Sequence, residues 1–157
     1  MQDFLSDFRQ TIEDASDKLL AISPEQSNVP RAAGKWSPKE IVGHLIDSAS
    51  NNHQRFVHAQ FTDDLIFARY EQEGWVRAQN YQSEEWAHLV QLWKLYNQHM
   101  LHLMSQIPED TRMKLRYKHN LHETASDSLS PNEPVTLDWF MRDYVDHMKK
   151  HLGQILG

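Results

Sequence analysis

The stretch TLDWFMRDYVDHMKKHLGQI, residues 136–155, decides the fold because its apolar residues recur every three or four positions. This spacing is typical of one buried face of an amphipathic α-helix. The charged residues fall on the opposite face. His147 and His151 lie four residues apart, and on a helical wheel both fall on the arc beside Phe140, away from the charged face. The stretch therefore predicts a final helix that directs two imidazoles inward or along the edge of a core.

Three earlier segments show the same helical spacing. The first covers residues 4–22 and ends before Pro24, and the third covers residues 83–107 and ends at Pro108. The second begins at Ser37-Pro38-Lys39-Glu40, a capping box with proline at the first helical position, and extends to about Gln60. MKLRYKH, residues 113–119, is the one segment suited to a short extended piece. We therefore predict an all-α fold, a four-helix bundle that occupies residues 1–157 as one domain.

Two connections between these helices are unusually long. Residues 61–82 and 106–133 exceed the about two to eight residues that normally join the helices of a bundle. Connections of this length suggest a functional role or a crossover between distant helices.

Composition narrows the classes of function. The chain has 157 residues and a net charge of −6, and no lysine or arginine cluster interrupts the acidic balance, so we expect no nucleic-acid partner. It has no cysteine, which excludes disulfides, thiolate metal ligands and a cysteine nucleophile. The N-terminal MQDFLSDFRQ is unlike a signal peptide, and no apolar run reaches the length of a membrane span. We expect a cytoplasmic protein without a membrane partner.

A polar line in the second helix supplies a third histidine. His44, Asp47, Asn51 and Arg55 recur at intervals of three, four and four residues. The line is either solvated, or it faces the interior of the bundle, in which case its polar groups need partners. A metal ion would then satisfy His44, and Asp47 would be placed to orient an imidazole.

Two interpretations of the histidines remain open on spacing alone. His44, His147 and His151 can form a catalytic metal site, in which three protein ligands leave one coordination position free. The last two can equally be histidines at the core edge, bonded to backbone or water. His119 and His122, in the second long connection, can approach an open site. The remaining histidines are predicted to be surface or ordinary core residues.

Three segments together resemble the DinB-like superfamily of small four-helix metalloproteins, especially its YfiT-like branch of metal-dependent hydrolases and thiol S-transferases. They are GKWSPKEIVGHLIDS (34–48), the RF of QRFVHA (54–59) with RYEQEGW (69–75), and TLDWFMRDYVDHMKKHLGQI. The resemblance implies that His44, His147 and His151 bind one divalent ion. It also implies a bundle with up-down-down-up helix order, consistent with the long connections. A histidine or proline common in the family before the last helix has no clear counterpart in KHNLHETASDSL (118–129).

Two enzymatic chemistries fit such a site. An ion with a free position, zinc or nickel by preference, can hold a low-molecular-weight thiol as its thiolate for attack on an electrophilic small molecule. The resemblance favours this thiol S-transferase activity, with bacillithiol, mycothiol or glutathione as cosubstrate. The alternative is a hydrolase that uses metal-bound hydroxide, with Asp47 or Glu71 moving protons. Met148 follows His147, so the H-E-x-x-H arrangement of metalloproteases is absent.

Further expectations concern the role of Arg55, the oligomeric state and a non-catalytic function. Arg55 can pair with a carboxylate of the substrate or cofactor, or be structural. The aromatic stripe of residues 83–107 is expected to pack the core. The relatives pair as dimers, and Trp75, Trp86, Trp93 and the exposed remainder of the first helix are candidates for an apolar patch that would support a homodimer. A third functional class is a metal-stabilised binding or stress-response protein without catalysis.

Overall fold

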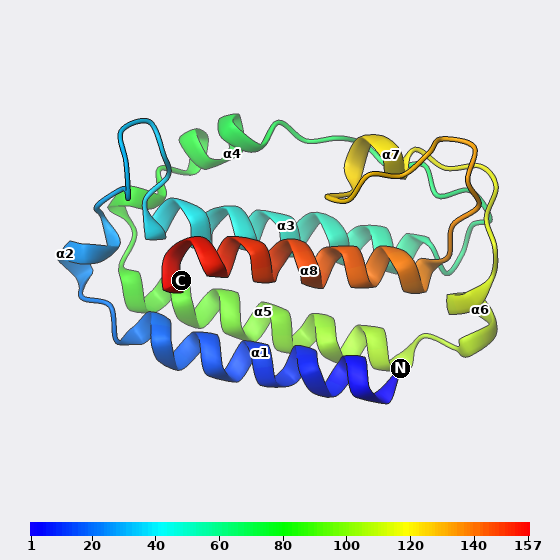
Figure 1. The fold of residues 1–157 in the computed structure, drawn as a ribbon, viewed down its shortest axis with the longest axis horizontal. Coiled ribbons are helices and arrows are strands. Elements are labelled where there is room, and N and C mark those ends of the chain that lie inside the picture. The colour runs from blue at the N-terminus through cyan, green and yellow to red at the C-terminus, as the bar shows by residue number, and fades with distance from the viewer.

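The computed structural model describes residues 1–157, and four long helices form its body. They are α1 (Gln2–Leu20), α3 (Pro38–His58), α5 (Trp86–Gln106) and α8 (Leu137–Leu156). Helices α1 and α8 run in one direction and α3 and α5 in the other (Figure 1). The predicted all-α bundle with up-down-down-up order is confirmed.

Local capping explains where the two histidine-bearing helices α3 and α8 begin. The Ser37 hydroxyl accepts a hydrogen bond from the Glu40 amide at 3.3 Å, and the Glu40 carboxylate accepts one from the Ser37 amide at 2.8 Å. The Thr136 hydroxyl accepts a hydrogen bond from the Trp139 amide at the start of α8. These bonds satisfy amides that the first turn of a helix leaves unpaired. They fix the helix starts, and so the register of the histidines that follow.

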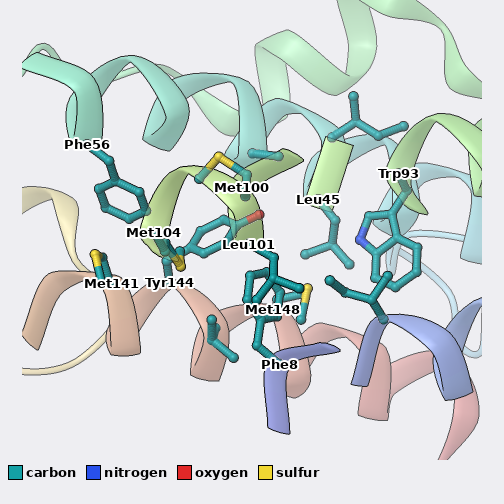
Figure 2. Close-up of a cluster of buried hydrophobic side chains, with 14 of the residues drawn as sticks. Phe8, Leu45, Phe56, Trp93, Met100, Leu101, Met104, Met141, Tyr144 and Met148 are labelled. Carbon is teal, nitrogen blue, oxygen red and sulfur yellow. The ribbon is translucent and has the colours of Figure 1, made fainter. Parts of the chain in front are cut away.

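The core lies between the four helices and consists of aliphatic, aromatic and methionine side chains (Figure 2). Phe8, Phe56 and Tyr144 meet edge to face, at ring-centroid separations of 5.9 Å for the Phe56–Tyr144 pair and 6.3 Å for the Phe8–Tyr144 pair. The buried Tyr144 hydroxyl donates to Asn97 Oδ1 at 2.6 Å, so the polar end of this side chain is paired. Tyr144 lies one turn before His147, so the same packing holds the histidine-bearing part of α8 against the bundle.

The aromatic stripe of α5 is interior. Trp93 is fully buried and Trp86 is 3% exposed, with its indole N–H donating to the Leu19 carbonyl. The prediction that the aromatic stripe packs the core is confirmed for Trp86 and Trp93, and their assignment to an apolar surface patch was wrong. Their spacing belonged to the core stripe of α5. Trp75 alone of the three is partly exposed, at 38%.

The connections between the long helices contain short helices. One is α2 (Pro24–Ser27), between α1 and α3. The two long connections contain α4 (Gln72–Gln79), the 3-10 turn η1 (Tyr81–Ser83), α6 (Glu109–Met113) and α7 (Leu121–Thr124). In Figure 1, α4 and α7 lie on the α3 side of the bundle, away from α1 and α5. None of the helices is both long enough and apolar enough to cross a membrane.

The two long connections are joined to each other by hydrogen bonds. The Asn120 side chain accepts from the Phe67 amide and donates to the Phe67 carbonyl, both at 2.9 Å. The extended piece expected near residues 113–119 is present as two isolated bridges, Leu65 to His119 and Arg116 to Val135. This pairing gives both connections a fixed position beside α3 and α8.

Candidate metal centre

Three histidines from the two ends of the sequence converge between α3 and α8. Their ligand-capable nitrogens, on His44, His147 and His151, all lie within 4.8 Å of one another. His44 Nε2 and His147 Nε2 are 3.4 Å apart. His44 is fully buried and the other two are partly buried, so the cluster has one deep ligand and two nearer the surface.

The spacing and donor set of the cluster fit a divalent ion. Zinc–nitrogen bonds of about 2.0 to 2.1 Å in a tetrahedral site place two ligand nitrogens about 3.3 to 3.4 Å apart. The 3.4 Å between the His44 and His147 nitrogens agrees with this value. Three imidazoles without a carboxylate suit a borderline-soft ion such as zinc or nickel better than magnesium or calcium, which prefer oxygen ligands.

Burial keeps these imidazoles unprotonated. The pKa of His44 is lowered from 6.5 to about 3. The main cause is burial away from water, and the neighbouring His147 and His151 also contribute. The pKa of His147 falls to about 4, mainly through burial and then through His151 and Lys150. Burial also lowers the pKa of His151, although its contact with Gln154 opposes the change. All three nitrogens therefore present free lone pairs at neutral pH, as metal ligands must.

Gln154 is hydrogen-bonded to one of the three imidazoles. The Gln154 side-chain oxygen lies 3.0 Å from His151 Nδ1 and can only accept, so Nδ1 carries the hydrogen and Nε2 keeps its lone pair. This is the kind of outer contact that orients metal-binding histidines. The sequence analysis missed Gln154, although its position three residues after His151 on one helix face was visible. Trp36 packs beside His44 at a ring-centroid separation of 5.0 Å.

Asp47 is buried next to the cluster but bonds elsewhere. Its Oδ1 accepts from the Tyr81 hydroxyl and from the Gln79 side-chain amide, both at 2.7 Å. Its Oδ2 and the His44 Nδ1 are both buried without a hydrogen-bond partner. Asp47 is thus buried, as expected if the polar side chains of α3 face the interior, but it accepts no hydrogen bond from a histidine. Burial raises the pKa of Asp47, against the lowering effect of its two donors.

A glycine allows the Tyr81 contact. The Tyr81 ring crosses α3 directly over Gly43, where an added Cβ would meet Tyr81 Cδ2 at 2.1 Å. Because no side chain occupies this point, the ring approaches the helix closely enough for its hydroxyl to reach Asp47. Neither Gly43 nor Tyr81 was singled out from the sequence, since only the fold brings η1 onto α3.

Two openings lead to the histidines. A hollow of about 460 Å³ is lined by His151, Trp36 and Glu73 together with residues before α3. On the other side, a small cavity of about 60 Å³ is lined by His147, Arg55 and Tyr70 among others. Glu73 was not singled out from the sequence. Glu71, which was, accepts a hydrogen bond from the Gly74 amide at the start of α4.

The loop histidines lie outside the cluster. His119 Nε2 donates to the Glu133 carbonyl at 2.8 Å and its Nδ1 accepts from the Leu121 amide, which ties the second connection together. The nearest charged partner of His122 is Glu123. Neither joins the group of possible ligands, which contains His44, His147 and His151 alone.

Comparison with known proteins places this arrangement in a family. The chain is similar over 99% of its length, and over 85% of the other chain, to YfiT from Bacillus subtilis, with a TM-score of 0.75 and 19% identity. YfiT is described as a probable metal-dependent hydrolase with an unusual four-helix bundle topology. Curated proteins gave no significant match. The model of the DinB superfamily matches residues 7–155, nearly the whole chain, and the protein therefore belongs to the DinB superfamily.

Proposed function

We propose that the protein is a metal-dependent enzyme that activates a low-molecular-weight thiol for transfer to an electrophilic small molecule. The observation that carries this proposal is the convergence of three unprotonated histidine nitrogens within 4.8 Å, beside two openings to solvent. A bound divalent ion, zinc or nickel, would supply Lewis acidity that lowers the pKa of a thiol at its free position.

The surroundings of the histidines favour a thiol as the nucleophile. No carboxylate is hydrogen-bonded to the three histidines, and Asp47 already accepts from Gln79 and Tyr81. A thiol needs no separate base once a metal has removed its proton, so a site without a positioned base suits it. The chain has no cysteine, so the thiol must come from a small molecule.

Hydrolysis of a small molecule is the second candidate. Glu73 lines the same open hollow as His151, and a carboxylate there can accept a proton from an attacking water. The fold shared with YfiT, described as a probable metal-dependent hydrolase, supports this candidate as well.

Metal content decides first whether the site exists. The wild type is compared with His147→Ala and, as a matched control, with His99→Ala, which removes an exposed histidine of α5. We expect about one zinc or nickel ion per chain in the wild type and the control, and none in His147→Ala. Added ion should raise the melting temperature only where the site is intact. Equal metal content in all three proteins would refute the proposed site.

Activity then separates the candidates. Thiol transfer predicts metal-dependent conjugation of glutathione to monochlorobimane, whereas hydrolysis predicts metal-dependent cleavage of a small ester without thiol. A metal-stabilised binding protein predicts a shift in melting temperature with neither activity. The Glu73→Gln variant discriminates further, because it should impair ester cleavage and leave bimane conjugation intact.

A further inference from the structure

Arg55 is a buried cation without an anionic partner. Its side chain projects from α3 and the residue is only 6% exposed, yet no ion pair of the chain includes it. Burial lowers its pKa. A buried guanidinium is costly unless its charge and its N–H groups are compensated.

The other buried arginines show how this chain normally compensates such a group. Arg112 forms an ion pair with Asp138, and Arg116 donates to three carbonyl oxygens, those of Ala59, Thr111 and Lys114. Arg55 donates to the Ala68 carbonyl at 2.9 Å and makes one long contact of 3.5 Å with Asn52 Oδ1. Its distance of 6.0 Å to the Phe67 ring centroid is at the outer limit of a cation–π contact.

Arg55 lines two cavities and has N–H groups that the protein does not use. A guanidinium has five N–H donors, and the protein uses two here. Arg55 and Tyr70 line both an outer pocket of about 350 Å³ and the inner cavity of about 60 Å³ that also contacts His147. Arg55 therefore lines both the outer pocket and the inner cavity that reaches a histidine of the candidate metal centre.

The inner cavity offers hydrogen-bond donors and little competing negative charge. Its wall includes three hydroxyl-bearing residues, Ser48, Tyr70 and Thr124, of which Thr124 already donates to the Asn120 carbonyl at 3.5 Å. Its one carboxylate, Asp143, already accepts three hydrogen bonds from the Ser126 and Asp127 amides, at 2.8 to 3.0 Å. A carboxylate ligand would thus meet an uncommitted cation together with neutral donors.

We propose that Arg55 binds the carboxylate of a small-molecule acid and thereby orients the other end of that molecule toward His147. The planar fork of a guanidinium matches the two oxygens of a carboxylate. Three glutamates at the outer pocket, Glu71, Glu73 and Glu123, oppose entry of a dianion such as phosphate more than entry of a monoanion. The inference rests on the proposed function for its orientation toward the metal centre, but anion binding itself needs no metal.

The first experiment uses metal-free protein, so that it is independent of metal-site function. Melting temperatures are measured in sodium acetate, sodium chloride and inorganic phosphate at equal ionic strength. Acetate should stabilise the wild type and Arg69→Gln, a matched control that removes an exposed cation from the outer pocket. Acetate should have at least about tenfold weaker apparent affinity for Arg55→Met, because the charge-assisted bond is lost. Arg55→Lys retains the charge without the fork and should be intermediate.

The second experiment tests orientation with cobalt(II)-loaded protein. Mercaptocarboxylates of increasing length are titrated beside uncharged mercaptoalcohols of the same length, with the thiolate-to-cobalt absorption band as the readout. One chain length should bind best, and its advantage over the matching alcohol should disappear in Arg55→Met.

The outcomes separate the two proposals. Absence of a histidine-dependent cobalt spectrum would refute the metal centre and leave the acetate result standing. Thiol binding with equal affinity for acids and alcohols would overturn the role of Arg55 and leave the metal centre intact. Equal responses of wild type and Arg55→Met to acetate, or stronger stabilisation by phosphate than by acetate, would also overturn it. If Arg55→Met does not fold, Arg55→Lys gives the decision, because a carboxylate response equal to that of the wild type would refute the fork.

Discussion

The metal-free protein should lose stability in acid because His44 is buried unprotonated. The pKa of this imidazole falls from 6.5 to about 3 on folding. Between these values the unfolded chain binds a proton that the folded chain does not, so the free energy of unfolding decreases as pH falls from 6.5 towards 3. Above about pH 7 the imidazole is neutral in both states and contributes no pH dependence.

The size of the effect follows from the same values. At pH 5 the pH lies 1.5 units below 6.5, the pKa of the imidazole in the unfolded chain. This difference lowers the free energy of unfolding by about 2 kcal/mol for His44 alone. His147 and His151 contribute in the same direction, and Lys150 lowers the pKa of both. Asp47 contributes in the opposite direction because burial raises its pKa. The loss must therefore be assigned to His44 by comparison between variants.

Urea denaturation of chelator-treated protein at pH 7.5 and pH 5 measures this loss. His44→Gln cannot titrate, so its loss between the two pH values should be smaller than that of the wild type by about 2 kcal/mol. His102→Gln, at an exposed position of α5, should behave as the wild type. The comparison uses each protein's own change with pH, so the constant cost of a substitution cancels. An identical loss in the wild type and His44→Gln would refute the reasoning.

Three further variants test the surroundings of the site. Gly43→Ala should destabilise the protein by about 1 to 3 kcal/mol, measured by urea denaturation, because the new Cβ collides with the Tyr81 ring; unchanged stability would contradict that close approach. Gln154→Ala should weaken zinc binding about 10- to 100-fold in a competitive chelator titration, since His151 Nδ1 loses its acceptor, and an unchanged affinity would exclude an orienting role. Asn120→Ala breaks both bonds to Phe67, and should increase hydrogen exchange in the two long connections and leave that of α5 unchanged; uniform exchange across the molecule would contradict a local clamp.

Residues that act within one helix were predictable from the sequence. The capping box at Ser37 and the inward direction of His147 follow from spacing along a single helix, where three and four residues bring side chains together. The convergence of His44 with that pair could not be obtained in this way, because it depends on how α3 packs against α8. Resemblance to a family supplied that link, and the structure brings the three side chains together.

Contacts made by the long connections could not be predicted. Tyr81 and Glu73 come from the connection between α3 and α5, and their approach to Asp47 and His151 depends on where that connection lies. The buried state of Arg55 has the same origin, since the Ala68 carbonyl that it bonds belongs to this connection. Helical spacing correctly predicted that the stripe with Trp86 and Trp93 packs the core, and assigning the same two tryptophans to a surface patch disregarded that spacing.

The distance in sequence between His44 and His147 makes a metal ion at this site a cross-link. The two ligands are 103 residues apart in a chain without cysteine. Closing a loop of about 100 residues removes unfolded-chain entropy equivalent to about 4 to 5 kcal/mol, the value that a disulfide of that span would contribute. Unlike a disulfide, such a tether would be released by a chelator without a redox reaction. Metal supply would then govern how long the C-terminal helix stays attached, and with it how much of the protein persists in a protease-resistant state.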